Sequence, residues 1–92
     1  MVLADEWKFS YRSQLHFTAI WGSAANDVFV IGVGGLISHY DGSQWQEMES
    51  GTLLNLNGIW GNSGTDVFVV GNGGTIIHYD GNQWKLAGLP PN

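Results

Sequence analysis

Short apolar runs alternate with turn-forming residues along most of the chain. In the second half the runs span residues 54–60, 66–70, 75–79 and 84–88, and they are rich in β-branched and aromatic side chains. The sequences GNSGT, GNGG and DGNQ separate them. Because no stripe of helical period persists for two turns, the pattern predicts short strands joined by tight hairpins, so neighbouring strands are antiparallel.

The same pattern occurs twice, 39 residues apart. Aligned without a gap, residues 15–53 and 54–92 are identical at 18 of 39 positions. The matched pairs include Trp21 with Trp60, Asp27 with Asp66, Gly35 with Gly74, His39 with His78 and Trp45 with Trp84. A repeat of this length is one supersecondary unit used twice. We therefore expect a first unit at 15–53, a second at 54–92, and an additional segment at 1–14.

The four strands of each unit differ in ways that predict their order. The second strands, DVFVI and DVFVV, are apolar on both faces, as expected between neighbouring sheets. The first strands carry small residues, Ala19 and Gly58, which suit a crowded axis. The fourth strands are mostly polar after their tryptophan, as an outer edge is. A four-stranded meander repeated about every 40 residues is typical of a β-propeller blade. The predicted fold is all-β, with two four-stranded antiparallel blades.

Both units resemble compact kelch-type repeats. FVIGVGG is followed by Tyr40-Asp41 and Trp45, and FVVGNGG is followed by Tyr79-Asp80 and Trp84. The YDGxxW segment is also similar to Asp-box-like repeats of bacterial propellers. The resemblance implies a propeller fold rather than a particular function. The shorter period and the extra residue in the glycine run depart from kelch, so kelch partner binding is not carried over.

Two blades are too few to close a propeller, which needs four to eight blades. Alone, they leave apolar sheet faces in water, although burying each large apolar side chain is worth about 1.5–3 kcal/mol. We therefore expect homo-oligomers that close head to tail, either a trimer with six blades or a tetramer with eight. The segment around Trp7 and Phe9 looks like a third outer strand. It is either an assembly strand that completes a neighbour's blade or the remnant of a preceding blade.

The composition excludes several classes of partner. Three Lys and Arg against eight Asp and Glu give a net charge of −5, which repels nucleic acid and anionic membranes. The chain has no cysteine, so it has no disulfide or thiolate chemistry. The first ten residues lack the basic and apolar regions of a signal peptide, and no stretch reaches the length of a membrane span. The compartment stays undetermined.

Candidate chemistry is sparse. The glycine runs join two strands rather than leading into a helix, so they are hairpin turns and not phosphate sites. His39 and His78 lie a full blade apart, which argues against a shared metal ion. Asp41 and Asp80 stand in turns that they stabilise, and nothing singles out a carboxylate pair or a nucleophilic triad. We predict no enzyme activity, no cofactor and no metal.

The tryptophans are the best candidates for a ligand site. Trp21 and Trp60 are expected to end the inner strands beside the loops that contain Asn26 and Asn62. An indole beside polar side chains suits a sugar ring, although packing in the core is the stronger interpretation. Two function hypotheses follow: a structural or interaction module that assembles with itself, and a multivalent lectin-like carbohydrate-binding protein.

The chain is also similar, in length and repeat count, to fucose-binding lectins whose two-blade chains trimerise into six-bladed rings. Those lectins depend on an arginine in each pocket. The single arginine here, Arg12, lies outside both repeats, which counts against the same specificity.

Overall fold

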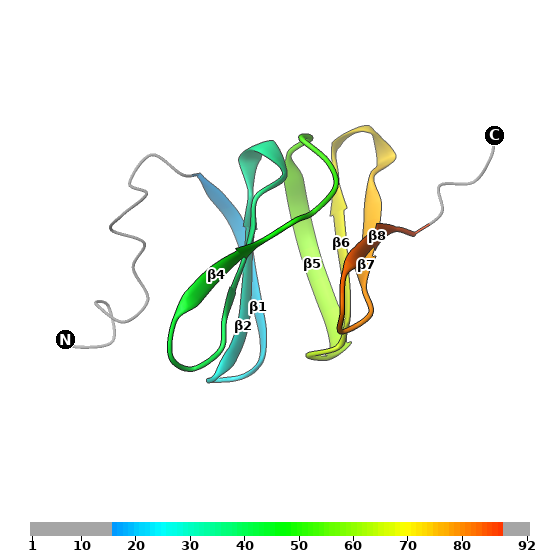
Figure 1. Ribbon diagram of the computed structural model, residues 1–92. Helices are drawn as coiled ribbons and strands as arrows, with labels where there is room; N and C mark the ends of the chain where they lie inside the picture. Colours follow the sequence, from blue (N-terminus) through cyan, green and yellow to red (C-terminus); the bar gives the residue numbers. More distant parts are fainter. Residues whose placement is uncertain (1–15, 88–92) are drawn as a thin grey trace.

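A computed structural model describes residues 16–87, which form two four-stranded antiparallel sheets side by side (Figure 1). In the first sheet, chain order is spatial order: β1 (Phe17–Ala24), β2 (Asp27–Gly32), β3 (Ile37–Tyr40) and β4 (Trp45–Met48). The second sheet repeats this with β5 (Leu56–Ser63), β6 (Asp66–Gly71), β7 (Ile76–Tyr79) and β8 (Trp84–Leu86). The predicted all-β fold of two four-stranded antiparallel blades is confirmed.

The predicted segment 1–14, with Trp7, Phe9 and Arg12, lies outside the described residues, and so does the end of the second unit at 88–92. Within residues 16–87, no helix is long and apolar enough to cross a membrane. The only helical pieces in that range are two short 3₁₀ turns, η2 (Val33–Gly35) and η3 (Asn72–Gly74).

The recurring turn residues have a local physical cause. In η2, Gly34 and Gly35 have φ of 77° and 81°, a region that side chains other than glycine rarely adopt. In the β3–β4 turn, the Asp41 carboxylate accepts hydrogen bonds from the backbone N–H groups of Ser43 and Gln44 at 2.8 and 2.9 Å. Gly42 follows with φ of 98°. The second blade repeats both arrangements, so the predicted hairpin roles are confirmed.

The inner strands end later than predicted. Trp21 pairs with Phe29 in mid-strand, and pairing continues through a bulge to Ala24 opposite Asp27. β5 likewise runs past Trp60 to Ser63, opposite Asp66. The expectation that the tryptophans end these strands is wrong. The glycine that follows each tryptophan stays in the ladder, and only two residues are left for each turn.

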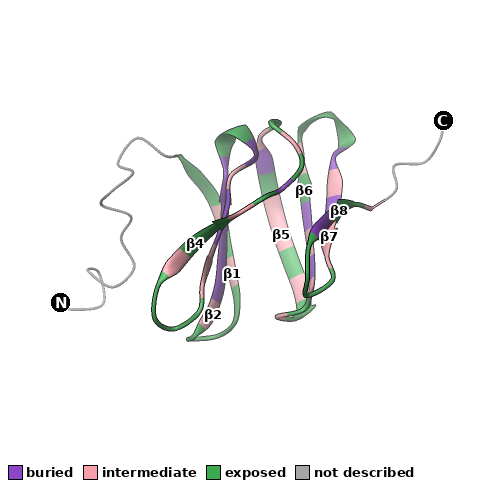
Figure 2. Cartoon of the chain, in the orientation of Figure 1, coloured by how far each residue is buried: buried purple, intermediate pink, exposed green. Residues whose placement is uncertain are grey.

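The hydrophobic core lies between the two sheets, where the inner strands β1 and β5 run beside each other. Figure 2 shows buried positions along β2 and β6 and exposed positions on β4 and the turns. β2 is buried on both of its faces, as predicted. β6 instead alternates along much of its length: Val67 and Val69, on the face that packs on the first blade, are buried, whereas Phe68 and Val70 on the other face are not.

Candidate functional site: the interblade contact and the open face

The first blade presents one face to the second, and this packing is called here the interblade contact. Because successive side chains in a strand point to opposite faces, each strand contributes alternate residues. The first blade contributes Trp21, Phe29, Ile31, Ile37 and Met48; the second contributes Leu56, Val67, Val69, Ile77, Tyr79 and Trp84.

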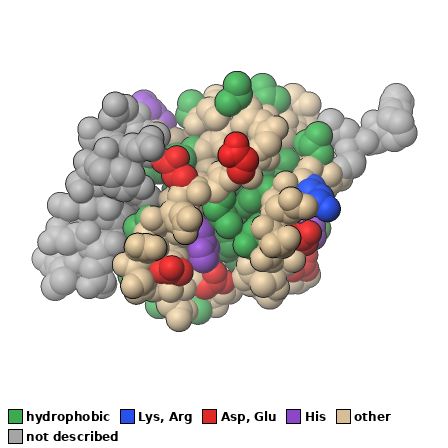
Figure 3. All heavy atoms as spheres, viewed as in Figure 1, with side chains coloured by type: hydrophobic (Ala, Val, Ile, Leu, Met, Phe, Trp, Pro, Cys, Tyr) green, Lys and Arg blue, Asp and Glu red, His purple; other side chains and the backbone are tan. Residues whose placement is uncertain are grey.

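A hollow opens at the outer side of the interblade contact. In Figure 3, hydrophobic side chains gather at its floor between the two sheets, with acidic side chains on the surrounding surface. The hollow has a volume of about 320 Å³, and its lining includes His39, Met48, Tyr79 and Trp84. It is a wedge between two outer strands that diverge from their common core.

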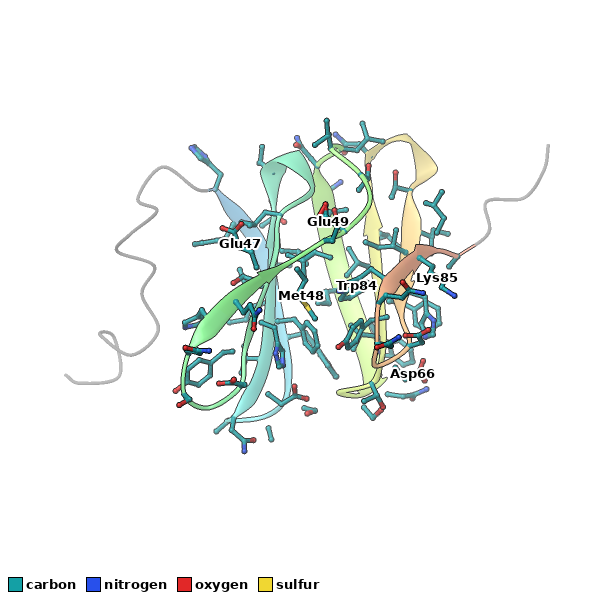
Figure 4. All side chains as sticks on the ribbon, viewed as in Figure 1. Glu47, Met48, Glu49, Asp66, Trp84 and Lys85 are labelled. Atoms are coloured by element: carbon teal, nitrogen blue, oxygen red, sulfur yellow. The ribbon has the colours of Figure 1, made fainter. Side chains whose placement is uncertain are left out.

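Aromatic rings build the centre of the contact. The Phe29 ring is 5.8 Å from that of Tyr79 and 6.0 Å from that of Trp84, both in edge-to-face geometry. Such pairs add about 0.5–1.5 kcal/mol beyond the area that they bury. Met48 of β4 and Trp84 of β8 point toward each other across the hollow (Figure 4), and the indole N–H donates to the Met48 sulfur at 3.4 Å.

Trp21 packs against a glycine of the other blade. A Cβ added at Gly61 would lie 2.5, 2.8 and 2.9 Å from three atoms of the Trp21 ring, so the indole occupies the space that any side chain would need. Two hydrogen bonds also join the two blades. The Thr18 hydroxyl donates to the Leu56 carbonyl, and the Gly34 N–H donates to Asn55 Oδ1 at 2.9 Å.

The second blade carries the same face without a neighbour among residues 16–87. We call it the open face, and it consists of Trp60, Phe68, Val70, Ile76 and His78. Trp60 is 55% exposed and Val70 45% exposed. Trp60 nevertheless stands over Phe68 at 6.1 Å, as Trp21 stands over Phe29 at 6.2 Å. The side chains are therefore arranged for packing, and what differs is the neighbour.

A histidine–aspartate pair recurs in each blade. His39 Nε2 lies 2.6 Å from Asp27 Oδ1, and the His39 ring stacks on Phe29 at 4.5 Å. Burial raises the pKa of Asp27, but the hydrogen bonds from Ser23 and His39, together with the charge of His39, outweigh it and leave that pKa below 3.8. The pair ties the β1–β2 turn to β3.

The second blade repeats the pair with Asp66 and His78, also at 2.6 Å. Hydrogen bonds from Asn62 and His78 lower the pKa of Asp66. In the part of the chain that the structure describes, no group of three His, Asp or Glu side chains could hold a metal ion. In each blade the pair therefore links the start of the second strand, next to the turn, to the third strand.

The four predicted ligand residues lie in separate blades, Trp21 and Asn26 in the first and Trp60 and Asn62 in the second. Trp21 lies in the interblade contact, while Trp60 lies on the open face one blade away. Asn62 donates to Asp66 Oδ2 at 3.0 Å, and Asn26 sits at its turn beside Gly42. Sugar binding by these residues stays a prediction.

Sequence reasoning missed Gly61 and Met48, which hold the interblade contact. A glycine directly after each tryptophan is a signal that could have pointed to Gly61, whereas Met48 has no counterpart in the second unit, where Ala87 takes its place.

The architecture defines a β-propeller blade pair. No family model matches the chain, and no curated protein matches it. The kelch-like or Asp-box-like type of the repeats therefore stays a prediction.

Among solved structures, the chain is similar to the β-propeller YCF48, solved bound to a D1 peptide. The two superpose with a TM-score of 0.67 at 19% sequence identity. The match covers 85% of this chain and 27% of the other, so the chain spans about a quarter of that propeller's length. At this identity the likeness shows the fold alone.

Proposed function

We propose that the chain is a non-enzymatic structural or interaction module that assembles with further copies of itself. Each copy places the open face of its second blade on the first blade of the next copy. Three copies form a closed ring of six blades, or four form a ring of eight. The observation that carries the proposal is the open face, whose Trp60, Phe68 and Ile76 repeat three residues that are packed between the blades as Trp21, Phe29 and Ile37.

The physical argument rests on the cost of leaving this face in water. Trp60 and Val70 are about half exposed on a surface built from apolar side chains. A further blade would bury them, at about 1.5–3 kcal/mol for each large side chain that becomes fully covered. The contact is heterologous, since one face of the chain meets a different face of the next copy, and such contacts generate rings when the rotation closes.

The test is the native mass of the full chain, measured by light scattering after size exclusion over a range of concentrations. We expect a mass of three or four chains, and the Trp60→Ala variant to shift to the monomer while keeping its fold. Trp21→Ala is the matched control, because the same truncation inside the chain should lower thermal stability first. A monomer at every concentration, or an oligomer that Trp60→Ala leaves intact, would refute the proposal.

The N-terminal segment offers a second way to join the copies. If Trp7 and Phe9 belong to an assembly strand, Trp7→Ala should also lower the native mass. If the segment is the remnant of a blade, Trp7→Ala should leave the mass unchanged while Trp60→Ala still reduces it.

The lectin-like alternative places a sugar on the Trp60 indole, which is exposed in the single chain. A ring joined through the open face would cover that indole, so this alternative requires copies that join through other surfaces, and such a ring would multiply weak sites into avidity. It predicts binding on a glycan array that is lost in an Asn62→Ala variant whose oligomer is intact. Silence across the array with an intact ring would leave the assembly role alone. The YCF48 structure contains a bound peptide, which supports a partner-binding role for blades of this shape.

A further inference from the structure

The repeat allows the contact between copies to be written residue by residue. This inference rests on the proposed assembly and concerns its strength. Inside the chain, a residue of the first blade meets a residue of the second. Between copies, the partner of each open-face residue is found by shifting both positions by one repeat.

Much of the interblade contact is reproduced by this shift. Trp60 would pack on Gly22 as Trp21 packs on Gly61. Phe68 would meet Tyr40 and Trp45 as Phe29 meets Tyr79 and Trp84. The receiving rings already have the required geometry, because Tyr40 and Trp45 are 5.1 Å apart and Tyr79 and Trp84 are 5.0 Å apart.

Two differences remove apolar contact on the open face. Val70 stands where the first blade has Ile31, and Ala87 stands where it has Met48. Ile31 is fully buried in the interblade contact, and Met48 supplies the sulfur that accepts the Trp84 indole N–H. A copy docked on the open face would therefore contact neither an isoleucine like Ile31 nor a sulfur like that of Met48.

Two further differences lie on the receiving face, which is the side of the first blade turned away from the second and includes Gly22, Val28, Tyr40 and Trp45. Ser38 replaces Ile77, and because Ser38 is 1% exposed in the single chain it offers a second copy no apolar side chain of the kind that Ile77 contributes to the interblade contact. The Ser38 hydroxyl is buried without a hydrogen-bond partner among the described residues. Ala25 replaces Gly64, where an added Cβ would overlap the Asp27 carboxylate. Between copies, the Ala25 methyl would therefore press on Asp66.

One difference strengthens the contact between copies, and the existing burial of two valines weakens it. Phe17 replaces Leu56 and offers a larger apolar surface to the open face. Val28 and Val30 of the receiving face are already buried in the single chain. They therefore offer little exposed apolar surface for a second copy to bury, and docking there is weaker than the contact inside the chain.

We propose that the contact between copies is a weakened version of the interblade contact, and that Ala25, Val70 and Ala87 set its strength. The consequence is a reversible assembly that dissociates on dilution while each blade pair stays folded. Restoring the residue that the other repeat carries should strengthen the assembly. Gain of association is the useful readout, because a variant that merely fails to fold cannot produce it.

The experiment measures the dissociation constant of the full chain by sedimentation velocity across a dilution series. We expect Ala87→Met to tighten association about tenfold and Val70→Ile about fourfold, from the added buried methyl and methylene groups. The matched control is Leu86→Met, which places the same side chain one residue away on the opposite face of the sheet, where it should have no effect. Met48→Ala, the reverse change inside the chain, should lower the melting temperature without tightening association.

The outcomes separate this inference from the proposed function. If the wild type is monomeric and Ala87→Met or Val70→Ile associates, these residues limit the strength of the contact as inferred, and the proposed function falls. If the wild type associates and neither variant tightens it, the copies join through other surfaces and the inference falls while assembly stands. If all forms are monomeric at every concentration, both fall.

Discussion

Gly61→Ala tests directly whether the Trp21 indole holds the two blades together. The new methyl would lie less than 3.0 Å from three ring atoms of Trp21, so the ring must move. The ring cannot retreat freely, because it stands over Phe29 at 6.2 Å within the core. Relief therefore requires the blades to separate or Trp21 to leave its rotamer.

The magnitude follows from two opposing effects. Overpacking a well-packed core costs about 1–3 kcal/mol. Replacing glycine by alanine also removes freedom from the unfolded chain, which returns about 0.4–1 kcal/mol. The net loss in the free energy of unfolding should therefore be about 1–2 kcal/mol. For a domain of this size, each kcal/mol lowers the melting temperature by about 4–8 °C.

The assay is urea and thermal unfolding followed by tryptophan fluorescence at a concentration where the chain is monomeric. Gly58→Ala is the control in the same strand, since its Cβ would meet only a Val70 methyl at 3.1 Å, and the first blade already has alanine at the equivalent Ala19. It should leave stability unchanged or slightly higher. Equal stability of Gly61→Ala and wild type would refute the packing of Trp21 on Gly61.

Two further predictions concern the same contact and the turn beside it. Phe29→Ala should lower the free energy of unfolding by about 3–5 kcal/mol, enough to unfold a small domain, because Phe29 is 1% exposed. Phe68→Ala should lower the stability of the monomer clearly less and weaken association instead, which thermal melting and native mass measured on the same samples would show. Equal losses of stability in the two variants would contradict the assignment of Phe29 to the interblade contact and Phe68 to the open face. Because the pKa of Asp27 is lowered in the folded state, its ionised form contributes stability that is present above about pH 3.8 and is lost as the pH falls through the folded pKa. Asp27→Asn should therefore flatten the loss of stability between pH 5 and pH 2 in acid titrations of the unfolding free energy, and an unchanged slope would exclude Asp27 as a contributor.

Local features of the fold could be predicted from the sequence because their causes are local. The glycine doublet at Gly34 and Gly35 is needed for positive φ, and Asp41 caps its own turn, so each recurs wherever the hairpin recurs. The strand order followed from which runs are apolar on both sides. The inner strands were predicted to end at Trp21 and Trp60; in the second unit GNSGT was interpreted as the turn, although Gly61 remains paired in the ladder.

The candidate site could not be predicted in the same way, because its properties depend on neighbours. Trp21 and Trp60 have the same local sequence and the same pairing, but one is packed against Gly61 and the other is 55% exposed. No pattern within either repeat distinguishes them. The difference comes from position in the chain, since one blade is followed by another and the second is followed by none among the described residues.

This asymmetry also bears on how an assembly of such chains would end. A row of copies joined head to tail always leaves one open face at one end, however many copies it holds, because each added chain covers one face and brings another. The cost of exposing Trp60 and Val70 is therefore never removed by lengthening the row. Only a ring, in which the last open face meets the first blade, covers every such face. A weak contact between two copies is compatible with a stable ring, because each chain of a closed ring is held by two contacts. Breaking one contact opens the ring but releases no chain.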